Sequence, residues 1–264
     1  HDMEFLNQCT AVITGASSGL GAEFARQLAP HAAELVLVAR REDRLKQLAC
    51  ELERPGLKII TKKVDLANAE EVAAFEEWIR NSGLRVNFLI NNAGLGDYGR
   101  FDEGSWEKIR HMLEVNITAL TRLTHAMLPI LKEEKQAAIL NVASVAGMTP
   151  LPKMAVYAAT KSYVISFSEA LRAELRDTGV RVTVLCPGPV STEFGSVAVR
   201  PNGEPVVAPE VFRMPADKVV ARALGAVERD CARVIPGWFL AFVMLLTAAM
   251  PMFILRLAMR GQAK

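Results

Sequence analysis

The sequence has few cysteines, no cluster of charge of one sign and no low-complexity tract. Its four cysteines include no CxxC pair and no spacing typical of metal ligands, so neither a disulfide framework nor a metal centre is expected. Lysine and arginine number 31 against 29 aspartate and glutamate, mixed along the chain, which argues against a nucleic-acid partner. The first residues do not resemble a secretory signal peptide, so we expect a cytoplasmic protein.

Apolar runs of strand length alternate with helical patterns through most of the chain. The predicted strands lie at residues 9–14, 34–39, 57–64, 86–91, 137–143, 180–186 and 232–235. The predicted helices lie at residues 19–29, 41–53, 69–82, 107–132, 156–178 and 215–230. Because the strands are apolar on both faces and helices stand in the crossovers, the strands should be parallel and covered on both sides. The sequence therefore predicts an α/β fold with a doubly wound parallel sheet, in one domain over residues 3–237.

A glycine-rich turn follows the first predicted strand. Gly15 and Gly19 would permit a tight turn, and Gly21 would let the next helix pack close to the strand. In a doubly wound sheet this position places pyrophosphate against backbone N–H groups at the positive end of a helix. A plain connector is the alternative. The residues assigned here to cofactor binding are Gly15, Ser17, Ser18, Gly19, Leu20 and Gly21.

The second predicted strand ends in arginines, where an NAD-binding protein usually has a carboxylate. Arg40 could pair with a 2′-phosphate, assisted by Arg41 or Ser17, because guanidinium makes bidentate bonds to phosphate. Two arginines on a solvated helix start are the alternative. We expect NADP(H) as the cofactor, with a preference for NADPH over NADH of at least about tenfold in kcat/KM.

Two further strand ends carry residues suited to the cofactor. Asp65, next to Leu66, could accept a hydrogen bond from the adenine amino group or act as the N-cap of the following helix. Small residues after the fourth strand would let the backbone approach the ribose, or would only brace the central strands. These residues are Asn92, Ala93 and Gly94.

The chain after the sixth predicted strand is rich in glycine and proline. Pro187, Gly188 and Val190 form a rigid turn that could present backbone groups to a nicotinamide amide, with Thr192 adding a hydroxyl. A simple exit turn is the alternative. Residues 191–215 are the most loop-like stretch of the chain, so we predict a substrate loop there.

Four residues carry the predicted chemistry. Tyr157 and Lys161 lie one turn apart on a helix, so the phenol and the ammonium share a face. The ammonium and an oxidised nicotinamide would together lower the pKa of the phenol. Ser144 follows the fifth strand at the carboxyl edge of the sheet and could bind a substrate oxygen. Asn116 lies in a segment of poor helix propensity, where its amide could break the helix and hold a water beside Lys161, or make an ordinary buried hydrogen bond.

Together these motifs resemble the classical short-chain dehydrogenase/reductase family. The matching residues, in order and spacing over residues 3 to about 237, are Gly15, Gly19, Gly21, Asp65, Asn91 to Gly94, Asn116, Ser144, Tyr157, Lys161, Pro187 and Gly188. The resemblance implies a Rossmann-type sheet of seven strands and hydride transfer without a metal. It also implies a tetrad in which Tyr157 donates the proton, Ser144 binds the same oxygen, Lys161 binds the nicotinamide ribose and Asn116 holds a relay water. Residues 39–41 and 92–99 resemble the NADP(H)-preferring branch of the family.

The chain departs from many members of that family after Gly237. Residues 234–255 carry no charge, a length that could cross a bilayer, but Pro251 leaves only residues 238–250 as an uninterrupted helix. A helix that is apolar all round has to be covered. Three interpretations of this helical extension, residues 238–264, are open. It could bury against another subunit of a homodimer or homotetramer or cap the substrate cleft, it could anchor the protein to a membrane surface, or it could span a membrane.

The expected substrate follows from the side chains around the cleft. If the extension and the substrate loop cover it, the pocket would be large and apolar, lined by Met148, Leu151, Met154 and Phe194. We therefore expect a bulky or apolar carbonyl or alcohol, such as an acyl, steroid-like or aromatic ketone. Other functions stay open: a catalytically silent NADP(H)-binding regulatory protein, a different reaction on the same scaffold, or a membrane-associated lipid carbonyl reductase.

Overall fold

Seven parallel strands form a single sheet in an α/β fold. The computed structural model describes residues 4–193, 195, 198, 200 and 210–262. The strands are β1 Thr10–Thr14, β2 Glu34–Ala39, β3 Lys58–Lys63, β4 Phe88–Asn91, β5 Ala137–Val142, β6 Val180–Leu185 and β7 Arg233–Val234. They are ordered β3-β2-β1-β4-β5-β6-β7, and every neighbouring pair is parallel. The predicted doubly wound seven-stranded sheet is confirmed.

The order of the strands reverses between β1 and β4, which are neighbours in the sheet. Connections from the two strands leave toward opposite sides at this point, and a crevice for ligands opens at their carboxyl ends. The glycine-rich turn after β1 and the segment after β4 both lie at this edge. The topology alone thus brings together motifs that are far apart in the sequence.

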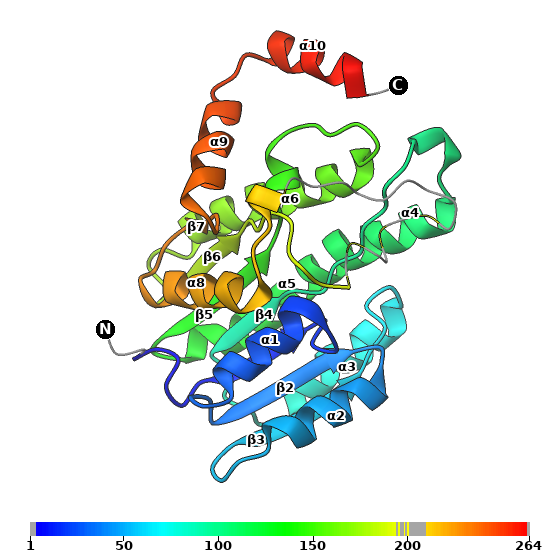
Figure 1. The fold of residues 1–264 in the computed structure, drawn as a ribbon. Helices are drawn as coiled ribbons and strands as arrows, with labels where there is room; N and C mark the ends of the chain where they lie inside the picture. Colours follow the sequence, from blue (N-terminus) through cyan, green and yellow to red (C-terminus); the bar gives the residue numbers. More distant parts are fainter. Residues whose placement is uncertain (1–3, 194, 196–197, 199, 201–209, 263–264) are drawn as a thin grey trace.

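Helices cover both faces of the sheet, with one apolar core on each side (Figure 1). One core packs under α1 Gly19–Leu28, α2 Glu42–Leu52 and α8 Ala216–Glu228. The other packs under α3 Ala69–Asn81, α5 Leu120–Glu133 and α6 Ala155–Glu174. Side chains along a strand point alternately into the two cores, because successive residues of a strand face opposite sides. Residues such as Val36 and Leu37, both fully buried, therefore belong to different cores.

The helix predicted over residues 107–132 is three consecutive segments. They are α4 Trp106–Leu113, a π-helical turn η2 Glu114–Ala119 and α5. The β-branched residues around Asn116 disfavour a regular α-helix, and the wider turn accommodates them. The expected break at Asn116 is confirmed, and π-turns of this kind are frequent at functional sites.

Short 3-10 segments and the C-terminal helices complete the described chain. The segments are η1 Phe101–Glu103, η3 Val145–Met148 and η4 Glu210–Phe212. A bridge between Val190 and Met214 joins the two ends of the predicted substrate loop, of which residues 194, 196–197, 199 and 201–209 lie outside the described part. After β7, α9 Trp238–Ala248 and α10 Met252–Gln262 project from the body of the domain (Figure 1).

Candidate active site

The glycine-rich turn is packed too tightly for larger residues. Gly15 and Gly19 have positive φ angles of 67° and 54°, a backbone conformation that glycine adopts without strain. A Cβ at Gly21 would overlap the carbonyl oxygen of Gly15, and one at Gly15 would lie 2.9 Å from the Cα of Ala93. The start of α1 is thus brought close to the ends of β1 and β4, leaving its first N–H groups at the crevice. This cradle fits the pyrophosphate of a dinucleotide.

The segment after β4 holds the turn in place. The hydroxyl of Thr14 accepts hydrogen bonds from the backbone N–H groups of Asn92 and Ala93, each at 3.0 Å. The side-chain amide of Asn92 donates to the carbonyl of Thr14 at 2.9 Å. The bracing role foreseen for these residues is therefore observed, and Gly94 continues the same segment toward Lys161.

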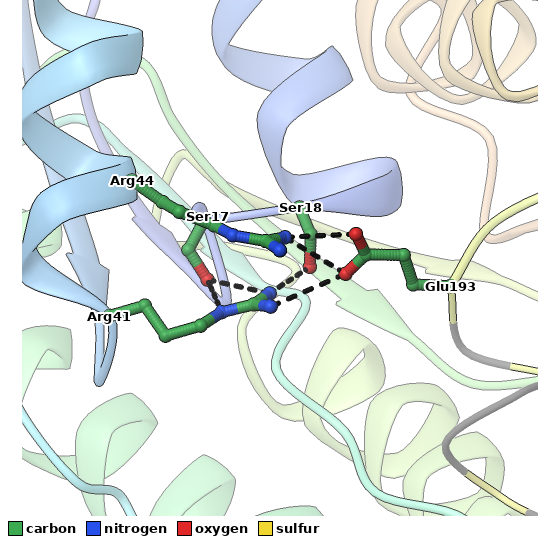
Figure 2. Close-up of polar contacts among 5 residues, drawn as sticks. All are labelled: Ser17, Ser18, Arg41, Arg44 and Glu193. Carbon is green, nitrogen blue, oxygen red and sulfur yellow. Dashed lines mark hydrogen bonds and ion pairs between the residues drawn. The ribbon is translucent and has the colours of Figure 1, made fainter.

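Arg41, and not Arg40, reaches the glycine-rich turn. Figure 2 shows its guanidinium against the hydroxyls of Ser18, at 2.7 Å, and Ser17, at 3.3 Å. Arg40 is exposed, and no hydrogen bond or ion pair joins it to the turn within the part of the chain that the structure describes. The sequence interpretation that placed Arg40 first is not supported by this geometry.

Two residues that sequence reasoning missed complete this cluster. Arg44 lies one turn after Arg41 on α2, and both guanidinium groups bind the carboxylate of Glu193, at 2.9 Å and 3.3 Å (Figure 2). These hydrogen bonds, from Arg44 first and Arg41 second, lower the pKa of Glu193. The spacing of the arginines could have indicated Arg44. Glu193 lies on the far side of the crevice, in the segment after β6, and no motif in the sequence indicated its role.

Asp65 and Leu66 follow β3 at the same edge. The carboxylate of Asp65 accepts from the backbone N–H of Ala67 at 3.0 Å. The N-cap of α3 is Asn68, whose side chain accepts from the N–H groups of residues 70 and 71. The alternative role of Asp65 as the N-cap is therefore wrong, because Asn68 already satisfies those N–H groups.

Tyr157 and Ser144 meet at the carboxyl end of β5. Ser144 is the N-cap of η3, and its hydroxyl oxygen accepts from the N–H of Ala146 at 3.1 Å. The hydroxyl of Tyr157 stands in the first turn of α6, near enough to Ser144 for the serine hydroxyl to act on its pKa. The packing of η3 on α6 is close, since a Cβ at Gly147 would lie 2.5 Å from the backbone carbonyl carbon of Lys161. This tight contact holds Ser144 and Tyr157 at the same strand end.

Lys161 is buried one turn beyond Tyr157. Its ammonium donates to the carbonyl of Val142 at 3.0 Å and lies 5.8 Å from the centre of the Tyr157 ring. Burial lowers the pKa of Lys161 to about 8. The side chain is thus held at the same strand end as Ser144, and a small change of pH alters its charge.

Burial also determines the pKa of Tyr157, against the sequence expectation. The phenol was expected to have a lowered pKa because of the neighbouring ammonium and an oxidised nicotinamide. In the structure, loss of solvent raises the pKa of Tyr157 to about 12, and only the hydrogen bond from Ser144 opposes that rise. The ammonium of Lys161 donates to the carbonyl of Val142 and does not offset the effect of burial. Tyr157 therefore carries its proton at neutral pH.

The side chain of Asn116 makes ordinary buried hydrogen bonds. Its amide donates to the carbonyl of Leu95 at 2.9 Å and to the hydroxyl of Thr160 at 3.0 Å, and its oxygen accepts from the N–H of Leu95 at 2.8 Å. Both donor hydrogens are engaged, so this amide could hold a water only through its oxygen, and the water-holding role stays a prediction. Asn116 instead fixes the segment that includes Gly94, where a Cβ would lie 3.2 Å from the ammonium of Lys161.

The turn after β6 faces the glycine-rich turn. The carbonyl of Pro187 accepts from the N–H of Val145 at 3.0 Å, which ties the turn to η3. The side chain of Thr192 would lie 3.5 Å from a Cβ at Gly19. An open groove of about 890 Å³ runs here, and its lining includes Ser18, Arg44, Thr192 and Glu193. Four of the predicted cofactor residues, Ser17, Ser18, Gly19 and Thr192, therefore line one groove.

Comparison with known proteins identifies the family. The family model described as short chain dehydrogenase matches residues 9–201. The chain belongs to the short chain dehydrogenase family. Curated relatives include sulfoacetaldehyde reductase 2 of Chromohalobacter salexigens, 38% identical over 207 residues (76% of this chain, 80% of the relative). The human very-long-chain 3-oxoacyl-CoA reductase is 33% identical over 215 residues (80% of this chain, 68% of the relative).

Solved structures of other short chain dehydrogenases share the fold. One from Sphingobium yanoikuyae, in complex with NADPH, has a TM-score of 0.80 and 34% identity, covering 91% of this chain and 93% of that one. One from Burkholderia phymatum, in complex with NAD, has a TM-score of 0.79 and 27% identity at the same coverage. The bulky-bulky ketone specific alcohol dehydrogenase of Comamonas testosteroni has a TM-score of 0.74 and 32% identity, covering 87% and 86%. This dehydrogenase is thus an oxidoreductase with a nicotinamide cofactor, and its neighbours hold either form of that cofactor.

The cavity beside Tyr157 in this dehydrogenase is smaller than expected. In the described part of the chain it measures about 80 Å³ and is lined by Met112, Met154 and the ion pair of Asp97 with Arg200. Met154 and Leu151 pack against the cluster of buried residues that contains Tyr157. Met148 belongs to a neighbouring cluster, and Phe194 lies outside the described residues. The large apolar pocket is not observed here, so a bulky substrate stays a prediction.

Proposed function

We propose that this short chain dehydrogenase reduces a ketone or aldehyde to an alcohol, or performs the reverse reaction, with NADP(H). The observation that carries the proposal is the close packing of η3, which Ser144 caps, on the first turns of α6, which brings Ser144, Tyr157 and Lys161 to the carboxyl edge of β5. The relatives named as reductases and the neighbour named for bulky ketones support carbonyl chemistry. An acyl, steroid-like or aromatic ketone is the substrate class we expect. Assembly as a homodimer or homotetramer and a cytoplasmic location remain predictions.

Tyr157, Ser144 and Lys161 would each have a different role in proton transfer. When bound, the cofactor supplies a hydride to the carbonyl carbon. Tyr157 donates its proton to the carbonyl oxygen, where negative charge develops. Ser144 accepts from Ala146, and its one hydrogen, directed at Tyr157 in the free protein, would turn to donate to the same oxygen. Lys161 would bind the nicotinamide ribose, and its positive charge would favour the phenolate that remains.

The pH dependence of the reaction follows from the two buried groups. With a pKa of about 12, Tyr157 keeps its proton throughout the neutral range, so it does not limit reduction there. Lys161, with a pKa of about 8, loses its positive charge as the pH rises past that value. We expect kcat/KM for reduction to be flat from about pH 6 to 7.5 and to fall above pH 8. Steady-state rates across this range, with circular dichroism at each pH as a control for folding, check this. A reduction rate that increases between pH 7 and 9 would contradict it.

The cluster at the glycine-rich turn supports NADP(H) over NAD(H). Arg41 and Arg44, with the hydroxyls of Ser17 and Ser18, provide donors for a 2′-phosphate. The carboxylate of Glu193, an anionic group of the protein itself, binds both guanidinium groups. A phosphate carries more negative charge than a carboxylate, and it would compete with Glu193 for the same donors.

Removing the charge of Glu193 tests this competition. In a Glu193→Gln variant the arginines lose their internal anion, so we expect the Kd for NADPH to fall by about two- to fivefold, a modest change because all three side chains are exposed. The Kd for NADH, which has no 2′-phosphate, should stay the same. Titration by fluorescence gives both values. Weaker NADPH binding in the variant, or an equal change for both cofactors, would overturn the assignment.

A further inference from the structure

The C-terminal tail, α9 and α10, exposes a large apolar surface. Its exposed side chains include Trp238, Phe242, Leu245, Met252, Phe253 and Leu257. Of the residues in α9 only Leu240 is buried. A surface of this kind on a protein in water marks a contact with a partner or a membrane.

The composition of the tail suits hydrocarbon and anionic headgroups. α9 has no charged residue, and the hydroxyl of Thr247 donates to the carbonyl of Val243 at 2.8 Å, so it would not be left unsatisfied in lipid. The indole N–H of Trp238 lies at the first residue of the helix, where an aromatic side chain with a polar group suits the membrane interface. After Asp230 the sequence contains no acidic residue at all, and α10 carries Arg256 and Arg260 one turn apart. Basic residues beside an apolar surface are attracted to anionic lipids.

The dimensions of the tail fit one leaflet. In the described part of the chain no single helix is long and apolar enough to cross a membrane, and the pair α9 and α10 is bent by 110°. The 11 residues of α9 extend about 16 Å at 1.5 Å per residue, roughly half of a hydrocarbon core of about 30 Å. A helix of that length can enter one leaflet, and the 110° bend then turns α10 back toward the surface, where the long side chains of Arg256 and Arg260 can reach the headgroups.

The base of the tail packs against the candidate active site. The side chain of Leu240 lies 2.6 Å from the position of a Cβ at Gly188, in the turn after β6. Phe239 stacks on Phe212 with 5.8 Å between ring centres, and α9 also contacts η3, the segment capped by Ser144. A membrane that holds the tail would therefore lie next to the substrate side of the crevice.

We propose that the tail is a monotopic anchor which inserts into an anionic membrane surface and lets the crevice take apolar carbonyl compounds dissolved in the bilayer. The substrate half of this statement rests on the proposed carbonyl reduction, whereas the anchoring half does not. A second copy of the chain fits the tail less well, because a two-fold contact between tails would bring together basic residues with no acidic partner after Asp230.

Vesicle flotation of the full chain tests the anchor. We expect binding to phosphatidylcholine vesicles and tighter binding when about a quarter of the lipid is phosphatidylglycerol. A Leu245→Asp, Phe253→Asp variant changes two side chains that are 67% and 71% exposed, so folding should be kept while the bound fraction falls by more than half. Trp106→Asp, at a site 67% exposed on α4, is the matched control and should bind as the unchanged protein does. Arg256→Gln with Arg260→Gln should remove only the preference for anionic lipid.

Activity assays then separate the anchor from the reaction. With NADPH, the Leu245→Asp, Phe253→Asp variant should reduce a water-soluble ketone at the normal rate and a vesicle-dissolved ketone more slowly. If no ketone is reduced while flotation gives the expected pattern, carbonyl reduction fails and the anchor stands. Absence of vesicle binding, or a stable dimer that the same two substitutions dissociate, would overturn the anchor.

Discussion

A Tyr157→Phe variant is expected to lose catalysis while still binding the cofactor. The hydroxyl of Tyr157 is the proton donor in our account, and general acid catalysis contributes about 10² to 10⁴ in rate. We therefore expect kcat for reduction to fall by at least about a hundredfold. The ring of Tyr157 is buried and packs near Met112 and Ala146, and phenylalanine keeps that packing. The Kd for NADPH should consequently change little. Steady-state kinetics and cofactor titration measure the two quantities separately.

Tyr163 provides a matched control on the same helix. It is 37% exposed, its hydroxyl lies 3.0 Å from that of Thr121, and its ring stacks on Phe167. The Tyr163→Phe variant also loses a phenolic hydroxyl from α6 but should keep full activity. More than a few per cent of activity in Tyr157→Phe, or an equal loss in Tyr163→Phe, would contradict the assignment of the proton donor.

The unchanged enzyme is expected to prefer NADPH over NADH by at least about tenfold in kcat/KM, which corresponds to about 1.4 kcal/mol. The preference should depend on Arg41, whose guanidinium lies on the hydroxyls of Ser17 and Ser18. An Arg41→Ala variant should lose most of the advantage of NADPH and keep its rate with NADH. Kinetics with both cofactors at several concentrations give the ratio.

Arg40→Ala is the control for this prediction. Arg40 is adjacent in sequence, equally charged and exposed, so its loss tests whether any nearby positive charge is enough. We expect the preference to remain near its original value. Equal use of the two cofactors by the unchanged protein would refute NADP(H) dependence. A larger effect of the substitution at Arg40 than at Arg41 would indicate that Arg40 binds the 2′-phosphate, as the sequence alone suggested.

The sheet and the cluster of Ser144, Tyr157 and Lys161 could be predicted from the sequence, because both depend on local sequence patterns. Buried strands show as runs of apolar residues, and a parallel sheet brings strand ends such as Ser144 to one edge. Tyr157 and Lys161 share a helix face at a fixed spacing. Their proximity to Ser144 could therefore be predicted from the order of strands and helices alone, and the alternation of strand and helix patterns in the sequence gives that order.

The features that the sequence did not reveal depend on long-range packing. Glu193 meets Arg44 only because the turns after β2 and β6 face one crevice in the folded chain. The pKa of Tyr157 depends on how completely neighbours exclude water, which no motif encodes. Likewise, Asn116 is recognisable as a break in a helix, but its partners Leu95 and Thr160 come from other segments.

The central claim is that this crevice transfers hydride between a nicotinamide and a carbonyl compound. The most direct test mixes the purified protein with NADPH and a panel of carbonyl compounds graded by size and apolarity, and measures both the loss of nicotinamide absorbance and the alcohol formed. We predict one alcohol for each NADPH consumed, with the larger and more apolar ketones preferred. Tight NADPH binding without any oxidation of NADPH across the panel would contradict the account and indicate a binding protein instead.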